Sequence, residues 1–196
     1  MKAWRAAALL VALHASACAR PNRESAAQLA RERVVSTPSS IAFVSANRSR
    51  PGLGSEIRFG GPLGRSALYL KFPSEWRARG VPQHAFLTLA AREGSASGGP
   101  PITLEAWRIN ADWQPAALLH WSDKPSLAPP YARARITPSS VQDLRIDVTE
   151  LVRFAAQNPE RDFGIAVVAS GNEGPGACFS TGLAGGAAPR LELYLR

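Results

Sequence analysis

The sequence is short of cysteine, histidine and lysine, and these shortages exclude several kinds of protein. Its 2 cysteines are too few for a disulfide-dense scaffold or an all-cysteine zinc site. Of its 3 histidines, His84 and His120 lie beyond the predicted leader, and neither is near a nucleophile motif. No Asx-rich loop of the calcium-binding kind occurs. We therefore expect no catalytic residues, no metal site and no cofactor.

Basic residues outnumber acidic ones by 23 to 15, which gives a formal net charge of +8. The positive charge is spread along the chain: no run of four or more basic residues occurs, and the arginines between residues 31 and 65 are spaced among Ser, Pro and Gly. Proteins that bind nucleic acid usually concentrate their charge on one patch or helix. We therefore expect no nucleic-acid partner.

Residues 1–17 have the pattern of a secretory signal. Lys2 and Arg5 precede an apolar run from Ala6 to Leu13, which is far shorter than the roughly 20 residues of a membrane-spanning helix. The segment Ala15-Ser16-Ala17-Cys18 that follows resembles the lipobox of bacterial lipoproteins, in which the cysteine is acylated and becomes the mature N-terminus. The same segment also fits a plain A-x-A cleavage site that leaves Cys18 as a free thiol.

The lipobox resemblance implies that Cys18 is lipidated and that a lipid anchor holds the protein in the cell envelope, as an outer-membrane lipoprotein or at the cell surface. Acylation of Cys18 would leave Cys178 as the only thiol, so that no disulfide could form within the chain. The polar residues 18–40, which end in Ser36-Thr37-Pro38-Ser39-Ser40, predict a flexible tether between anchor and domain.

From Ile41 onward, short apolar segments alternate with turn signals. Several have a period of two: Leu68 and Leu70 would face one side of a strand and Tyr69 the other. This alternation is typical of antiparallel sheets with one buried face. It predicts that residues 41–196 form an all-β, jelly-roll-like antiparallel β-sandwich. The expected strands are Ile41–Ala46, Glu56–Phe59, Ala67–Phe72, Phe86–Arg92, Ile102–Ile109, Leu118–Trp121, Ala132–Ile136, Leu144–Val148, Phe163–Ala169, Cys178–Thr181 and Arg190–Leu195.

One short helix is expected within this β pattern, over residues 147–157. Asp147 is placed to accept hydrogen bonds from the first free amides, and Glu150 stands at the capping-box spacing. Leu151 and Val152 begin an apolar stripe along one face. Asn158-Pro159 predicts the end of the helix.

A series of short motifs follows a fixed order along the expected domain, and it resembles the DNRLRE domain, also classed as carbohydrate-binding module family 96. The resemblance implies a β-sandwich at the cell surface that binds a ligand or presents its loops. Carbohydrate is the leading ligand class. The opening loop departs from the family, because Ala46-Asn47 stands where an acidic and an aromatic residue are common. The motifs that carry the resemblance are Glu56–Gly60, Arg65–Phe72, Ala85–Ala91, Trp113, Trp121 with Lys124-Pro125, Arg145–Val152, Asp162–Val167, Phe179–Thr181 and Ala188–Leu193.

A carbohydrate site requires aromatic ring faces and planar hydrogen-bond donors such as arginine. Of the tryptophans at 76, 107, 113 and 121, those at 113 and 121 match motif positions that we expect to pack internally. Trp76 lies in a polar stretch after a strand, between charged neighbours, and is the expected exposed ring. The predicted ligand-binding residues are Trp76, Arg77, Arg79, Arg48 and Arg58.

The sequence thus predicts a lipid-anchored, non-catalytic envelope module that binds polysaccharide. The alternative is a structural or adhesive envelope protein that binds a protein partner. An exposed groove lined by Trp76 with arginine nearby would favour the first hypothesis. A smooth surface with every tryptophan buried would favour the second.

Overall fold

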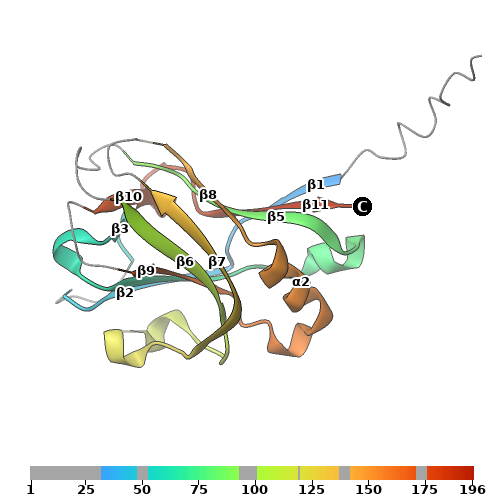
Figure 1. Ribbon diagram of the computed structural model, residues 1–196, viewed down its shortest axis with the longest axis horizontal. Helices are drawn as coiled ribbons and strands as arrows, with labels where there is room; N and C mark the ends of the chain where they lie inside the picture. Colours follow the sequence, from blue (N-terminus) through green and yellow to red (C-terminus); the bar gives the residue numbers. More distant parts are fainter. Residues whose placement is uncertain (1–31, 48–52, 93–100, 119, 137–141, 171–175) are drawn as a thin grey trace, which may run out of the picture. The chain divides into compact units, whose positions relative to one another are not determined.

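The structure, a computed structural model, describes residues 32–47, 53–92, 101–118, 120–136, 142–170 and 176–196. These residues form two main antiparallel sheets that face each other across a hydrophobic core (Figure 1). The predicted all-β sandwich is confirmed, and α2 (Thr149–Gln157) is the one α-helix among the described residues. Cys18 and Arg48, two of the predicted functional residues, lie outside the described residues.

Each main sheet is built from strands that are distant in the sequence. The four-stranded sheet has the order β1 (Glu32–Ser36), β11 (Arg190–Leu195), β5 (Pro82–Leu89) and β8 (Leu144–Asp147). The five-stranded sheet has the order β2 (Ser40–Ser45), β4 (Ser66–Lys71), β9 (Ile165–Ser170), β6 (Ile102–Ile109) and β7 (Leu127–Ile136). A small third sheet pairs β10 (Ala177–Ser180) with β3 (Glu56–Phe59).

The sandwich begins earlier in the chain than the sequence pattern indicates. Residues 32–36, within the predicted tether, form β1, and Val34 lies opposite Leu193 of β11. After the short connection 37–39, β2 begins in the other sheet. Strand β1 has few apolar residues and its side chains are exposed or half-buried. Pairing with β11 therefore makes this segment a strand, and its own pattern gives no such signal.

The predicted alternation of buried and outward side chains places the core correctly. Leu68 and Leu70 of β4 point into the space between the sheets and are fully buried there. Leu193 of β11 and Ile146 of β8 meet them from the opposite sheet, within the same hydrophobic cluster. Removing such side chains from water supplies about 2 kcal/mol each, which is the main force holding the two sheets together.

The outer face of the five-stranded sheet is partly covered by the connection between β6 and β7. Tyr69 points outward as predicted, yet it is fully buried because Trp113 of this connection packs on it, with ring centroids 5.9 Å apart. Burial raises the pKa of Tyr69. The Trp113 indole also donates a 2.7 Å hydrogen bond to the carbonyl of Phe163. The expected internal packing of Trp113 is confirmed.

The predicted strand Leu118–Trp121 is wrong. Leu118 ends the 3-10 helix η3 (Pro115–Ala117), and Trp121 begins the 3-10 helix η4 (Trp121–Asp123). The Asp123 carboxylate accepts a 2.8 Å hydrogen bond from the His120 amide, which closes a tight turn. A local side-chain-to-backbone bond of this kind competes with strand pairing. Its described apolar residues, Leu118 and Trp121, pack in the hydrophobic cluster that contains Tyr69 and Trp113.

Helix α2 lies at one end of the sandwich (Figure 1). As predicted, Asp147 accepts a hydrogen bond from a first-turn amide, that of Thr149, at 3.0 Å. The predicted capping box does not form: the helix begins at Thr149, Val148 is its N-cap without a side-chain cap, and Glu150 pairs with Arg153 at 2.9 Å. Arg153 also donates to the carbonyl oxygens of Pro82 and Gln83, which ties the helix to β5.

Candidate functional site

Trp76, the expected exposed ring, is buried. It lies in the 3-10 helix η2 (Glu75–Arg79), is 5% exposed and belongs to the main core cluster. The tight turn of η2 directs the tryptophan inward, leaves Glu75 and Arg79 outside and half-buries Arg77, so the polar stretch is amphipathic. The exposure predicted for Trp76 is therefore corrected: its ring has no free face on which a sugar could stack.

The arginines that flank Trp76 are engaged in ion pairs. Arg77 pairs with Asp162, and Arg79 pairs with Glu32 of β1 at 2.8 Å. Arg79 and the edge of Trp76 line a surface groove of about 320 Å³ beside β1, together with Val35. The Trp76 ring is almost fully buried, whereas sugar stacking requires an open ring face.

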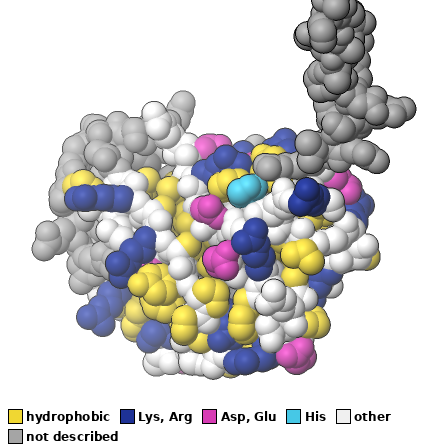
Figure 2. All heavy atoms as spheres, turned by 45° about the vertical axis from the view of Figure 1, so that its right-hand side comes forward, with side chains coloured by type: hydrophobic (Ala, Val, Ile, Leu, Met, Phe, Trp, Pro, Cys, Tyr) yellow, Lys and Arg dark blue, Asp and Glu magenta, His cyan; other side chains and the backbone are white. Residues whose placement is uncertain are grey.

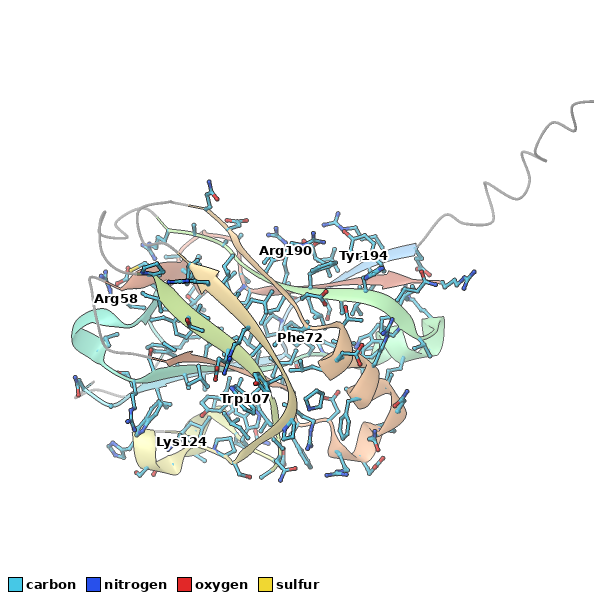
Figure 3. The ribbon with its side chains drawn as sticks, viewed as in Figure 1. Arg58, Phe72, Trp107, Lys124, Arg190 and Tyr194 are labelled. Carbon is cyan, nitrogen blue, oxygen red and sulfur yellow. The ribbon has the colours of Figure 1, made fainter. Side chains whose placement is uncertain are left out.

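Arg58 lies far from this groove. It belongs to β3, at the end of the sandwich opposite α2 and η2 (Figure 3), and it approaches Glu56 at 3.7 Å. The structure therefore does not bring Arg58 together with Arg77 and Arg79, and the five predicted residues do not form one site.

A different pair of aromatic residues, Trp107 and Tyr131, lies on the outer face of the five-stranded sheet. Trp107 of β6 and Tyr131 of β7 are direct cross-strand neighbours, and their rings stack with centroids 4.2 Å apart and an angle of 16°. Tyr131 is 43% exposed and Trp107 is half-buried. Figure 3 shows Trp107 on the side of the sandwich formed by β6 and β7. Of the described tryptophans and tyrosines, Tyr131 is the most exposed.

Polar cross-strand contacts hold this aromatic pair in place. The Trp107 indole donates a 3.0 Å hydrogen bond to Glu105, and the other oxygen of Glu105 accepts from Arg133 at 2.7 Å. Arg133 in turn lies 5.4 Å from the centre of the Tyr131 ring. The hydrogen bond to Glu105 raises the pKa of Arg133, which therefore stays cationic. Four side chains thus fix one another on two strands.

Tyr131 also lines an open groove of about 410 Å³ between β7, β5, β8 and α2. The other polar side chains of the groove are Gln83, His84, Asp147, Glu150 and Arg153. Figure 2 shows the side of the molecule that includes the α2 end, where acidic, basic and hydrophobic side chains are mixed without a large patch of one charge. The groove thus combines one aromatic ring with several hydrogen-bonding groups.

Asp147 is the carboxylate of the groove whose protonation is altered by its neighbours. Burial alone would raise its pKa, but the hydrogen bonds from the hydroxyl and amide of Thr149 outweigh this effect and hold the pKa below its usual range. His84 and Arg153 lower it further by their charge. Asp147 is therefore an ionised hydrogen-bond acceptor near neutral pH.

Sequence reasoning included Trp107 among the aromatic candidates and did not select it. A usable signal was present: Leu104 and Ala106 alternate with Glu105 and Trp107, so an inward-facing Leu104 places the tryptophan on the outer face. Tyr131 had no comparable signal, because the expected strand began at Ala132 and the observed β7 begins at Leu127.

Two other features of the described residues offer no site. A cavity of about 30 Å³ beneath α2, next to the buried Arg108, has room for one water molecule. Arg108 is held by the carbonyl of Pro129 at 3.0 Å and by the Phe154 ring. Within the ranges that the structure describes, no three His, Cys, Asp or Glu side chains gather closely enough to hold a metal ion.

A search of protein-family models finds no match to this chain, and a comparison with curated protein sequences finds no similar protein.

Proposed function

We propose that this chain is a non-catalytic envelope module that binds polysaccharide through Tyr131 and the adjoining groove. Supporting observations are the exposed ring of Tyr131 and the stacking of Trp107 against one of its faces. A sugar ring presents C–H groups on its flat side and hydroxyls at its rim. The Tyr131 ring can pack on these C–H groups. The side chains of Gln83, His84 and Asp147 can form hydrogen bonds with the hydroxyls.

Preorganisation supports this use of Tyr131. The ring is fixed by Trp107 and by the Glu105–Arg133 pair before any ligand arrives. A fixed aromatic ring loses little conformational freedom on binding, so more of the contact energy contributes to affinity. Stacking on a preformed platform is also tolerant of sugar identity, because every pyranose has a C–H face.

Binding is a better proposal than catalysis for this groove. A general acid must be protonated at the working pH, whereas the pKa of Asp147 lies below its usual range. Glu150 is engaged by Arg153 at 2.9 Å, and Asp147 is engaged by Thr149. The two carboxylates of the groove therefore serve as hydrogen-bond acceptors in this proposal.

The proposal retains the lipid anchor at Cys18 and the envelope location. Among the described residues, no helix has the length and apolar character needed to cross a membrane. A test of the anchor is metabolic labelling with a fatty acid in a bacterial host. We expect label on the wild type and none on Cys18→Ser, and label that persists in the variant would disprove acylation at this cysteine.

The glycan proposal is tested by affinity electrophoresis against a panel of neutral and acidic polysaccharides. We expect the wild type to be retarded by at least one polymer. Tyr131→Ala should weaken that retardation about tenfold, the equivalent of about 1.4 kcal/mol, because the central aromatic contact is lost. Tyr131→Phe should bind nearly as well as the wild type, since stacking does not need the hydroxyl.

Tyr194→Ala is the matched control for this experiment. Tyr194 is a partly exposed tyrosine on β11, in the other sheet, and it lies outside the groove. Its replacement should leave glycan retention unchanged. Equal losses in Tyr131→Ala and Tyr194→Ala, or no retention of the wild type by any polymer, would refute the proposal.

The alternative, an adhesive protein with a protein partner, has one feature in its favour: β7 is a ten-residue edge strand. Partners often add a strand to such an edge. However, β7 contains Pro129 and Pro130, and Arg133 and Arg135 project from it. Proline and charge on an edge strand discourage pairing with another chain. These features favour the glycan proposal.

A further inference from the structure

The outer face of the four-stranded sheet carries a cluster of arginines that the glycan groove does not use. Glu192 of β11 points outward, yet it is 5% exposed because three arginines surround its carboxylate. Arg190 donates to it at 3.0 Å, Arg33 of β1 lies at 3.2 Å, and Arg145 of β8 lies at 3.5 Å. Figure 3 shows Arg190 and Tyr194 on this side of the molecule, away from Trp107.

This cluster has a surplus of positive charge. Three guanidinium groups face one carboxylate, and the only other carboxylate that approaches them among the described residues, Asp143, reaches Arg190 at 3.7 Å. Asp147, at the far edge of the same face, is engaged by Thr149. The side chains of Arg33 and Arg145 are 54% and 46% exposed, so their guanidinium groups remain open to a ligand.

The guanidinium groups are also held in place. Arg145 stacks on the Phe86 ring at 3.5 Å and donates a hydrogen bond to the Tyr194 hydroxyl at 3.3 Å. Phe86 and Tyr194 meet edge to face, with centroids 6.0 Å apart. A guanidinium presents a planar fork of donors that matches two oxygens of a phosphate. Held arginines with unused donors are therefore suited to an oxyanion with several oxygens.

Apolar side chains on the same face indicate where the oxyanion comes from. Val35 of β1, opposite Glu192 in the register, is 48% exposed, and Tyr194 is partly exposed. A flat face that combines arginine, tyrosine and an exposed aliphatic side chain suits the headgroup layer of a membrane, where phosphate and apolar groups lie close together. A soluble phosphate would make no use of Val35.

We propose that the outer face of the four-stranded sheet docks on a membrane surface by binding lipid headgroup phosphates with Arg33, Arg145 and Arg190. The proposal rests on the anchor at Cys18 for proximity: an extended chain from Cys18 to Glu32, where β1 begins, reaches at most about 50 Å. The two functions then use different residues. The three arginines bind the lipid, whereas the glycan is bound by Tyr131 of the other sheet and by the adjoining groove, whose residues His84 and Asp147 stand at the edge of the arginine face.

The test is co-sedimentation of the full chain with vesicles, in a Cys18→Ser background that removes any acyl chain. Vesicles of phosphatidylcholine alone are compared with vesicles that also contain phosphatidic acid. We expect binding only to the second kind. Arg33→Gln and Arg145→Gln should each lower the partition coefficient about fivefold, which corresponds to about 1 kcal/mol per arginine. All variants carry the predicted leader, residues 1–17, so any contribution of the leader to vesicle binding is the same in each and cancels when the partition coefficients are compared.

Two further variants separate recognition from net charge and from misfolding. Arg135→Gln removes the same single charge from the opposite sheet and should leave vesicle binding unchanged. Arg145→Lys keeps the charge without the planar fork and should bind more weakly than the wild type. The melting midpoint is measured for each variant. Arg33 has a largely exposed side chain, whereas Arg145 stacks on the Phe86 ring, so Arg33→Gln gives a valid test even if Arg145→Gln fails to fold.

Several outcomes would overturn the proposal. An equal loss of binding in Arg135→Gln would reduce the proposal to non-specific charge. Binding of inorganic phosphate or of an acidic polysaccharide at these arginines without vesicle binding would assign the cluster to a soluble ligand. Failure of the glycan proposal is distinct, because Tyr131→Ala should weaken glycan retention and leave vesicle binding intact.

Discussion

The ring of Tyr131 lies face to face with the indole of Trp107, with centroids 4.2 Å apart, across two antiparallel strands. The tryptophan braces the tyrosine, and the tyrosine lines the groove. This division of roles gives the two residues different expected effects on binding. It also separates them from Trp76, which serves the core.

Trp107→Ala should weaken glycan retention less than Tyr131→Ala does. The variant keeps the ring that contacts the sugar and removes its support, so we expect a loss of about threefold, within the range of one aromatic pair of about 0.5–1.5 kcal/mol. Affinity electrophoresis on the same polymer measures both variants. A Trp107→Ala variant that binds as tightly as the wild type would show that bracing has no role.

Trp76→Ala should destabilise the fold and leave the glycan affinity of the folded fraction unchanged. Replacement of a buried tryptophan by alanine costs about 3–5 kcal/mol through lost burial and the cavity left behind. Urea unfolding measures the free energy, and electrophoresis under native conditions measures binding. Unaltered stability with lost binding would reverse the assignment and restore Trp76 as a ligand-binding residue.

Asp147→Ala should lower the free energy of unfolding by about 1 kcal/mol, because the first-turn amide of Thr149 loses its acceptor. The pKa of Asp147 is depressed in the folded state, so its contribution is present above the unfolded pKa and is lost as the pH falls through the folded pKa. The difference between wild type and variant should therefore shrink below about pH 4.

Asp112→Ala is the control for the loss of stability. Asp112 pairs with Lys71 at 2.9 Å on the surface, where ion pairs contribute little. We expect a smaller loss of stability from Asp112→Ala than from Asp147→Ala, measured by urea unfolding at neutral pH. An unchanged melting midpoint in Asp147→Ala would show that the hydrogen bond from the Thr149 amide does not stabilise the start of the helix.

Gly164→Ala should be strongly destabilising, because Gly164 has φ +101° and an added Cβ would collide with the backbone carbonyl of Leu70. The matched control is Gly185→Ala, which has φ +80° and open space around the added atom. Both variants carry the cost of a left-handed residue, about 1–2 kcal/mol. The clash adds to this only at Gly164, so its melting midpoint should fall further. Equal melting midpoints for the two variants would show that the backbone of β4 shifts to make room for the added methyl group at Gly164.

Much of the fold was predictable because it depends on short-range pattern. The inward positions of Leu68, Leu70 and Ile146 follow from a period of two, and each is buried as that pattern requires. Strand β1 and the turn at His120–Asp123 could not be found in this way. The first is a strand because β11 pairs with it, and the second is a turn because Asp123 closes it.

The candidate site was less predictable, because it is formed by side chains from segments that are distant in the sequence. Polarity of the neighbouring residues suggested that Trp76 is exposed, yet one turn of η2 directs it into the core. The partnership of Trp107 with Tyr131 depends on a register between β6 and β7 that includes an irregularity beside Trp107. No local pattern encodes that register.

By itself the amino-acid sequence determined the class of this protein: an antiparallel sandwich with one short helix, because alternation of apolar and polar side chains selects which face of each strand is buried. Only the tertiary structure decided which aromatic residues face solvent and which arginines meet around Glu192. Both outcomes depend on strand order and on the coverage of one sheet face by a connection, and these are set by packing between segments far apart in the chain.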